Sequence, residues 1–162
     1  MKVFLTGIIA TPYAREFLVK CARVLRDKGI TCYTPVEGTW TPAVGDRAES
    51  TVADDFAALH EADALVAILD GLSVDDAVAA HIGAFHAMMR LGMPKQGIIG
   101  VLHDTRVARW DWAAGARAVN AYVVECIHER GRIVSSFAEA TAELLRWAGR
   151  TDETSSVDAG IA

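Results

Sequence analysis

Two kinds of spacing between apolar residues alternate along the chain. Short, nearly continuous apolar runs predict five strands, at 3–6, 30–35, 62–70, 97–102 and 133–134. Between them, apolar residues recur at helical spacing and predict helices at 12–28, 51–61, 75–91, 116–129 and 136–149. In the helix at 51–61 we expect Phe56 and Leu59 to point inward. The polar segment 36–50 is long for a connection, which favours a functional loop.

Local signals mark several helix ends. Pro12 suits a first helical turn, and the Lys28-Gly29 pair is typical of a helix end. Ser136 and Glu139 have the spacing of a capping box, in which a serine and a glutamate satisfy the first turn of a helix. These signals support the helix boundaries that the apolar pattern predicts.

Strands that alternate with helices predict right-handed crossovers and one parallel sheet. The run ADALVAILD at 62–70 is apolar at almost every position, as a strand covered on both faces should be. The expected fold class is therefore α/β: an open, mainly parallel five-stranded sheet with helices on both faces, flavodoxin-like or Rossmann-like. We expect a single domain over 1–149, followed by a flexible polar tail over 150–162.

Composition narrows the function. The chain of 162 residues has a net charge of −5 with scattered basic residues, whereas nucleic-acid binding needs clustered Lys and Arg. No apolar run reaches the roughly 20 residues of a membrane helix, and the first residues predict a strand instead of a signal peptide. The three cysteines, Cys21, Cys32 and Cys126, lack metal-site or redox-motif spacing. We therefore expect buried thiols in a cytoplasmic protein without nucleic-acid or membrane partners.

Ligands of open parallel sheets bind beyond the carboxyl ends of the strands. The loops there hold aromatic and acidic residues: Tyr13, Glu37, Trp40, Asp70, Asp75, Asp76, Trp110 and Trp112. Aromatic rings beside carboxylates suit a flat heterocycle attached to a sugar. The alternative is that these acids are solvated or cap helices, because Asp favours caps and turns.

Asp70, Asp75 and His81 are the candidates for catalysis. Asp70 ends the central strand, and Asp75 and Asp76 open the next helix, whose N-terminus favours ionised acids. His81 follows within the same helix and can face the same mouth. Ionised carboxylates there could accept hydrogen bonds from ribose hydroxyls or stabilise a sugar with oxocarbenium character.

Three stretches of 1–148, KVFLTG, DFAALHEADALVAILDG and DDAVAAHIGAFHAM, resemble the nucleoside 2-deoxyribosyltransferase family, which includes nucleoside-monophosphate N-glycosidases. The resemblance implies cleavage or transfer at the N-glycosidic bond of a nucleoside or nucleotide-like molecule, by a hydrolase or transferase of nucleotide metabolism. It also implies a homodimer or larger homo-oligomer and no cofactor. With the strand-end rule, it yields these candidate substrate contacts: Gly7, Tyr13, Glu37, Trp40, Gly71, Asp76 and Asn120.

The sequence departs from the family at its central motif, D-S-G-T-x-x-E-x-G-x-A. The family's nucleophilic glutamate is replaced by His81, and Ser-Gly-Thr by Asp76-Ala77-Val78. His81 could act as a general base toward water while Asp75 or Asp76 supplies negative charge. Asp76 would repel a phosphate, which favours an uncharged nucleoside. The alternative is a catalytically silent protein that binds nucleosides or nucleotides on the same fold.

Other histidines and the apolar face of the same helix leave further alternatives. His81 and His86 lie roughly 140° apart around a helix, which is poor geometry for one metal, and we expect none. We expect His60, His103 and His128 to be surface or capping residues. Phe85, Met88 and Met89 form an apolar helix face that suits core packing or a subunit interface.

Overall fold

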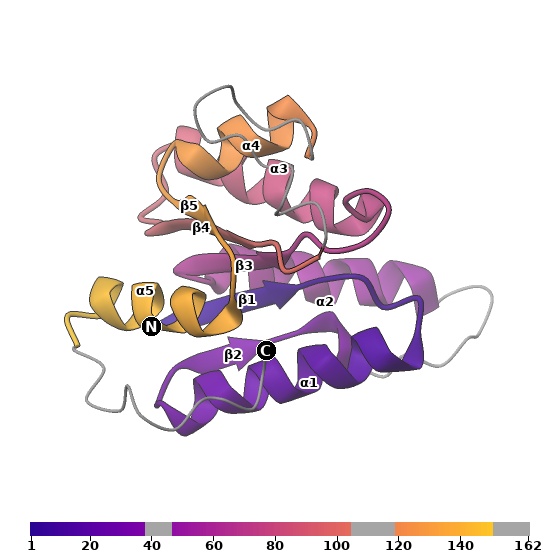
Figure 1. Ribbon diagram of the computed structural model, residues 1–162. Helices are drawn as coiled ribbons and strands as arrows, with labels where there is room; N and C mark the ends of the chain where they lie inside the picture. The colour runs from indigo at the N-terminus through magenta and orange to yellow at the C-terminus, as the bar shows by residue number, and fades with distance from the viewer. Residues whose placement is uncertain (38–46, 105–118, 151–162) are drawn as a thin grey trace.

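Five parallel strands form the sheet, as the computed structural model of residues 1–37, 47–104 and 119–150 shows (Figure 1). The strands are β1 (Lys2–Thr6), β2 (Thr31–Tyr33), β3 (Ala64–Ile68), β4 (Gly97–Val101) and β5 (Arg132–Val134). Their order is β2-β1-β3-β4-β5, and every neighbouring pair is parallel. The predicted α/β class and parallel sheet are confirmed. The tail expected over 150–162 lies outside the described residues, apart from Arg150.

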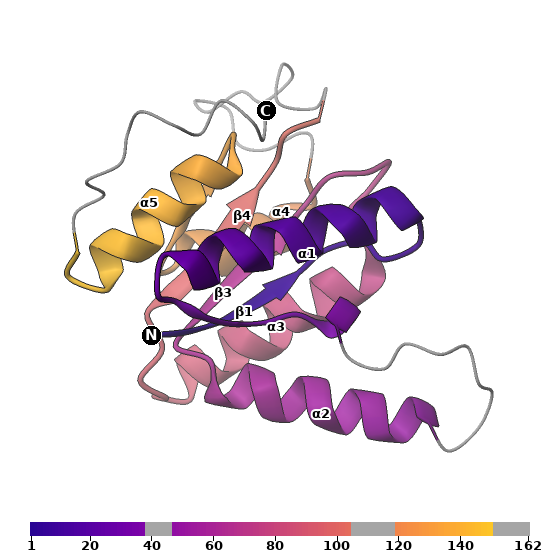
Figure 2. The same ribbon diagram turned by 90° about the horizontal axis from the view of Figure 1, so that it is seen from below.

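Helices cover both faces of this sheet. They are α1 (Pro12–Asp27), α2 (Arg47–Glu61), α3 (Asp76–Arg90), α4 (Ala121–His128) and α5 (Phe137–Trp147), with a 3₁₀ turn, η1 (Pro35–Glu37). Alternate strand residues divide the core into two layers. Leu5, Val66 and Ile99 pack with α1 and α5, whereas Phe4, Leu65 and Ile98 pack with α2, α3 and α4. Figure 2 shows α1 crossing in front of the strands, with α3 behind them.

The predicted capping signals place the helix ends correctly. Thr11 caps α1, Pro12 occupies its first turn, and Gly29 follows with a φ of 73°, which favours glycine. At α5, the backbone N–H of Glu139 donates to Ser136 Oγ at 3.2 Å, and Ser136 Oγ donates back to Glu139 Oε1 at 3.3 Å. Capping chemistry therefore fixes how these two helices meet the sheet.

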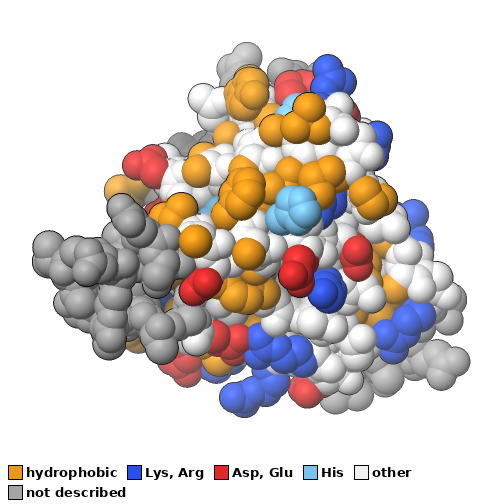
Figure 3. Space-filling view, turned by 180° about the vertical axis from the view of Figure 1, so that it is seen from behind, with side chains coloured by type: hydrophobic (Ala, Val, Ile, Leu, Met, Phe, Trp, Pro, Cys, Tyr) orange, Lys and Arg blue, Asp and Glu red, His pale blue; other side chains and the backbone are white. Residues whose placement is uncertain are grey.

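The predicted loop at 36–50 is wrong at both ends. It begins inside η1, and α2 starts at Arg47, before the predicted helix start at 51. The orientation of Phe56 is also wrong: it is 55% exposed, whereas Leu59 is buried as expected. Asp55 and Leu59 lie on the inward face of α2, and Ala62, directly after the helix, continues the spacing of that face. Phe56 therefore points outward. Figure 3 shows hydrophobic side chains scattered over the face of the molecule that is seen from behind.

The apolar face of α3 is part of the core. Phe85, Met88 and Met89 are all buried against the sheet and α4. Because they are already covered by their own chain, the alternative that they form a subunit interface is wrong. The cysteines are buried as predicted, and burial raises the pKa of Cys21 and Cys32 to about 12. No helix in the described part of the chain is long and apolar enough to cross a bilayer.

Candidate functional site

His81 is anchored to the carboxyl end of β1. Its Nδ1 lies 3.0 Å from Oγ1 of Thr6, the last residue of that strand. Its half-buried ring packs edge-on against Phe4, with the ring centroids 5.0 Å apart. The second turn of α3 therefore brings an imidazole to the edge of the sheet where ligands of this fold class bind.

The surroundings of His81 favour its neutral form. Burial lowers the pKa of the imidazole, and the charges of Asp55 and Asp75 oppose that shift. Since an ordinary histidine has a pKa near 6.5, His81 is mostly neutral at pH 7 and keeps one ring nitrogen with a lone pair. Among the described residues, Thr6 is the hydrogen-bond partner of this ring, through Nδ1. No described residue hydrogen-bonds Nε2.

Asp55 and Tyr33 complete a cluster around His81. The Tyr33 hydroxyl donates to Oδ1 of Asp55 at 2.6 Å, and its ring stacks on Phe4 at 5.3 Å. Burial, followed by this hydrogen bond and the Asp55 charge, raises the pKa of Tyr33. Tyr33 therefore remains a donor that holds the carboxylate in place. We call Thr6, Tyr33, Asp55 and His81 the His81 cluster; it joins β1, β2, α2 and α3.

Sequence reasoning missed three members of this cluster. Thr6 and Tyr33 end strands, whereas the strand-end rule points to the loops that follow. Asp55 lies within a helix, outside any loop. The available signal was the inward face of that helix, on which Asp55 is a charged residue at helical spacing from Leu59 and Ala62.

Asp75 is the N-cap of α3, as the alternative reading of the loop acids expected. Its Oδ1 accepts from the backbone N–H of Ala77 at 3.0 Å and of Val78 at 3.4 Å. The same carboxylate influences the pKa of His81, so cap and imidazole are electrostatically connected. Asp76 lies exposed in the first turn of the helix.

Asp70 has a different environment. Its Oδ2 bonds Nδ1 of His103 at 2.9 Å, and its Oδ1 accepts from the backbone N–H groups of His103 at 2.6 Å and Asp104 at 3.2 Å. Asp104 in turn accepts from the N–H of Gly71 at 2.9 Å. The His103 ring packs edge-on against Phe17 of α1. The expectation that His103 is a surface or capping residue is therefore wrong: with Asp70 it ties the ends of β3 and β4 together.

The carboxyl edge thus carries two polar groups on opposite sides of the sheet. The His81 cluster lies on the side of α2 and α3, beside Phe4. The pair of Asp70 and His103 lies on the side of α1, beside Phe17. Sequence analysis placed Asp70, Asp75 and His81 around one mouth. The Asp75 charge acts on the pKa of His81, whereas the Asp70 side chain bonds His103 instead.

Comparison with known proteins identifies the fold. No protein-family model matches the chain, and no curated protein sequence matches it significantly. Among solved structures, a conserved protein from Enterococcus faecalis V583 is similar with a TM-score of 0.71 and 25% identity, over 90% of this chain and 98% of its own. A 2-deoxyribosyltransferase from Bacillus psychrosaccharolyticus has a TM-score of 0.64 and 16% identity, over 87% and 90%. One from Leishmania mexicana has a TM-score of 0.63 and 17% identity, over 90% and 97%.

The chain has the 2-deoxyribosyltransferase fold. At these identities the likeness establishes the fold alone. The resemblance that the sequence showed is therefore supported in its architecture, and the chemistry has to be argued from the residues of this chain.

Gly7 and Gly71 are predicted substrate contacts, and the local structure of the deoxyribosyltransferase fold also explains why a glycine stands at each position. Gly7 is buried, and a Cβ there would lie 2.9 Å from Leu18 and 3.1 Å from Ile68, so a larger residue would force the β1–α1 connection outward. Gly71 has a φ of 130°, which favours glycine. Tyr13, in the first turn of α1, is 83% exposed. The substrate contacts expected of these residues stay predictions.

Two other predicted contacts have partners within the protein. Glu37 pairs with both terminal nitrogens of Arg26, and this hydrogen bonding lowers the pKa of the glutamate. Asn120 caps α4 by accepting from the N–H of Tyr122 at 2.9 Å. Trp40, Trp110 and Trp112 lie outside the described residues. In the described part of the chain, no group of three or more His, Cys, Asp or Glu side chains is arranged to hold a metal ion.

Proposed function

We propose that the protein cleaves or transfers the N-glycosidic bond of a nucleoside or nucleotide-like molecule. One observation carries the proposal: a half-buried imidazole, bonded to Thr6 and within the field of the Asp55 carboxylate, at the carboxyl edge of a sheet with the deoxyribosyltransferase fold. That edge is where ligands of open parallel sheets bind. The fold likeness and the local chemistry support the same class of reaction.

The proposed step uses His81 as a general base. The bond between the anomeric carbon and the base nitrogen breaks, its electron pair leaves with the base, and the sugar gains oxocarbenium character. A water oxygen then bonds the anomeric carbon, and its proton goes to Nε2 of His81. In the tautomer whose Nδ1 donates to Thr6, the lone pair is on Nε2. In a transfer reaction, the nitrogen of a second base takes the place of water.

In this proposal, the Asp55 carboxylate supplies the negative charge that stabilises the transition state. A carboxylate beside the ring stabilises the positive charge of an oxocarbenium-like transition state. Imidazole as the nucleophile would instead give a glycosyl-imidazolium, whose positive charge lies beside an electron-poor carbon. For that reason His81 suits deprotonation of water, while Asp55, with Asp75 nearby, suits charge stabilisation.

The charge at the start of α3 favours an uncharged nucleoside as the substrate. Asp75 and Asp76 stand together there, and Asp75 already occupies the N–H groups of Ala77 and Val78. A 5′-phosphate at this helix end would meet two carboxylates. We therefore propose a nucleoside in preference to a nucleoside monophosphate.

Base release tests the proposal. The purified protein is incubated with a panel of nucleosides and nucleotides, and free base is measured by chromatography. We expect release from at least one nucleoside, and a loss of about 10²–10⁴-fold in His81→Gln because a general base is removed. His60→Gln is the matched control, since His60 is exposed on α2. No base release from any compound would overturn the proposal.

Two further outcomes separate enzyme from binding protein. Calorimetric binding of a nucleoside without base release would assign the silent binding role. In that case His81→Glu restores a carboxylate where the resemblance expects a nucleophile. Base release by this variant alone, with a glycosyl adduct in its intact mass, would show that the native chain binds nucleosides on an otherwise competent scaffold.

A further inference from the structure

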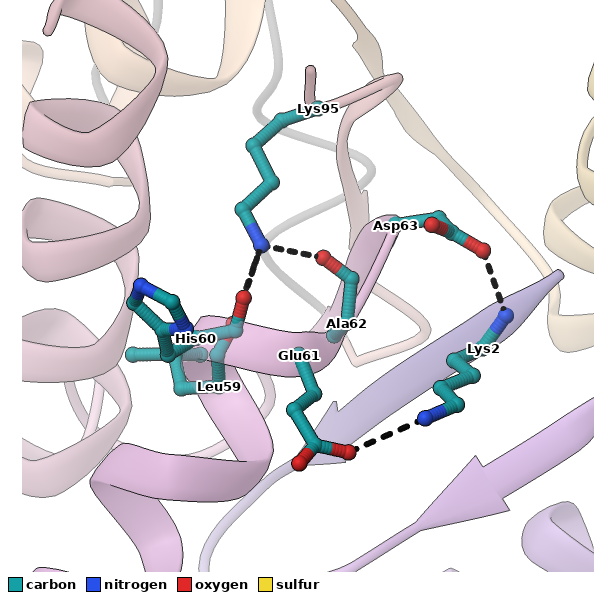
Figure 4. Close-up of polar contacts among 7 residues, drawn as sticks. All are labelled: Lys2, Leu59, His60, Glu61, Ala62, Asp63 and Lys95. Atoms are coloured by element: carbon teal, nitrogen blue, oxygen red, sulfur yellow. Dashed lines mark hydrogen bonds and ion pairs between the residues drawn. The ribbon is translucent and has the colours of Figure 1, made fainter. Parts of the chain in front are cut away.

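A single buried lysine holds the C-terminal end of α2. Nζ of Lys95, which precedes β4, donates to the carbonyl oxygens of His60 and Ala62, each at 2.5 Å, and lies 3.5 Å from that of Leu59 (Figure 4). The last carbonyls of a helix have no partner within the helix. An ammonium group offers three donors, so Lys95 satisfies these oxygens from one point.

The surroundings of Lys95 are those of an anchor. The residue is only 8% exposed, and its Nζ lies 5.2 Å from the centroid of the Phe85 ring. Burial lowers the pKa of Lys95, and the charge of Asp63 opposes the shift. Burying a charged group is costly unless it is hydrogen-bonded. The carbonyls and the aromatic face offset that cost, and replacing Lys95 would leave the carbonyls unsatisfied.

Lys2 provides a contrast at the same end of α2. Its Nζ pairs with Glu61 at 3.0 Å, and both side chains are more than half exposed. Exposed ion pairs contribute little to stability. The backbone N–H of Lys2 donates to the Asp63 side chain at 2.7 Å (Figure 4). This hydrogen bond does not involve the Lys2 side chain, so a substitution at Lys2 leaves it in place. Lys2 is therefore a natural control for Lys95.

We propose that Lys95 is a positioning residue that holds Asp55 beside Tyr33 and His81, acting through α2. Asp55 lies four residues before Leu59, on the same inward face, which is about 6 Å along the helix axis. The apolar contacts of Leu59 and Ala62 do not depend on direction, whereas hydrogen bonds do. The Lys95 bonds therefore fix how α2 is rotated and how far it extends toward the His81 cluster. The consequence for turnover rests on the proposed function; the coupling to Asp55 does not.

The hydroxyl proton of Tyr33 reports the position of Asp55 without any substrate. The chain has three tyrosines, so NMR of tyrosine-labelled protein shows few signals, and Tyr33→Phe assigns the one that matters. In the native protein we expect slow exchange of this proton, because it is donated to Asp55 at 2.6 Å. In Lys95→Met we expect exchange about tenfold faster, the ratio expected when a hydrogen bond to a charged group is weakened. Lys2→Met should leave it unchanged.

Kinetics provide the second measurement, on the nucleoside that gives base release. Lys95→Met should lower kcat while leaving KM within about twofold, since an interaction with the reacting sugar is disturbed. The decisive comparison is with Asp55→Asn. If Lys95 acts through Asp55, the double variant is no slower than Asp55→Asn alone; independent effects would multiply.

The outcomes separate the proposals. Equal Tyr33 exchange in Lys95→Met and Lys2→Met, or multiplying losses in the double variant, would overturn the positioning role. Faster Tyr33 exchange in a protein that releases no base would uphold the coupling and overturn the proposed function. If Lys95→Met does not fold, Lys95→Gln, which keeps two donors, replaces it. Its Tyr33 exchange and its rate in combination with Asp55→Asn are then compared in the same way.

Discussion

The His81 cluster and the pair of Asp70 and His103 each contain one histidine and one aspartate at the same edge of the sheet. They differ in how their hydrogen-bonding capacity is used. Asp70 accepts three hydrogen bonds from the segment that follows β4. In the described structure, Asp55 accepts one from Tyr33, and His81 shares one with Thr6. The first arrangement fastens two strand ends, whereas the second leaves acceptor sites without a partner among the described residues.

This difference shows that closeness of histidine and aspartate is not enough to define a site. The Asp70 side chain stabilises a connection because its partners are two backbone N–H groups and the His103 ring. The buried Nε2 of His103 has no hydrogen-bond partner among the described residues. The Asp55 and His81 side chains come from two helices, and the Asp55 charge acts on His81 near a strand end. In the described structure each has a single hydrogen-bond partner. The predictions below test whether Asp70 and His103 contribute to stability while the His81 cluster contributes to base release.

The largest expected effect separates the two histidines. His81→Gln should reduce base release by about 10²–10⁴-fold, because the general base is lost. His103→Gln should keep most of the rate and lower the free energy of unfolding. Initial rates and urea unfolding measure both quantities. A greater loss of rate in the His103 variant would reverse the assignment.

The next comparison separates the two aspartates. Asp55→Asn should slow base release by about tenfold to a hundredfold, since a carboxylate near the oxocarbenium ion is lost. The charge of Asp55 also raises the pKa of His81, so the acid limb of the pH–rate profile should move to lower pH in this variant.

Asp70→Asn should act on stability instead. The amide keeps the size of the side chain but loses acceptor capacity beside three donors, and we expect the free energy of unfolding to fall by about 1–3 kcal/mol. The acid limb should stay where it is in the native protein. A shift of that limb equal to the shift in Asp55→Asn would show that Asp70 belongs to the catalytic group.

Tyr33→Phe should have a smaller effect. It removes the donor that holds Asp55 but keeps the carboxylate and the ring packed on Phe4, so we expect a rate loss of roughly tenfold or less. Steady-state rates at saturating nucleoside measure it. An effect as large as that of His81→Gln would mean that the Tyr33 hydroxyl takes part directly in the reaction.

The smallest effect concerns stability and pH. The folded-state pKa of His81 is lowered, so the unfolded chain binds more protons between the two values, and stability falls as pH drops below about 6.5. In His81→Gln this contribution should be absent. Urea midpoints of both proteins across the acidic range measure the difference; identical slopes would contradict the burial of a neutral imidazole.

The sequence was sufficient for the fold and for part of the site. Apolar runs such as ADALVAILD locate the strands, and capping signals locate α1 and α5, because these are local properties. The placement of His81 near the strand ends followed from its position in α3. The bond between Asp70 and His103 spans 33 residues, and a pairing of two neighbouring strand ends becomes visible only when the sheet order is known.

Asp55 was missed for a related reason. The strand-end rule directs attention to loops, yet a helix packed on the sheet can point an inward side chain at the same edge. Phe56 was assigned inward because it is apolar, although the face of α2 that carries Leu59 and Ala62 selects Asp55 instead. A charged residue on an otherwise apolar helix face was the informative signal.

The most direct test of the account compares two titrations of the same group. NMR gives the pKa of His81 in the native protein, and the pH dependence of base release gives the pKa that limits the rate in acid. The account predicts that the two midpoints coincide, lie below the ordinary histidine value of about 6.5, and shift down together in Asp55→Asn. A rate that does not follow the titration of His81, or a His81 midpoint above that value, would contradict it.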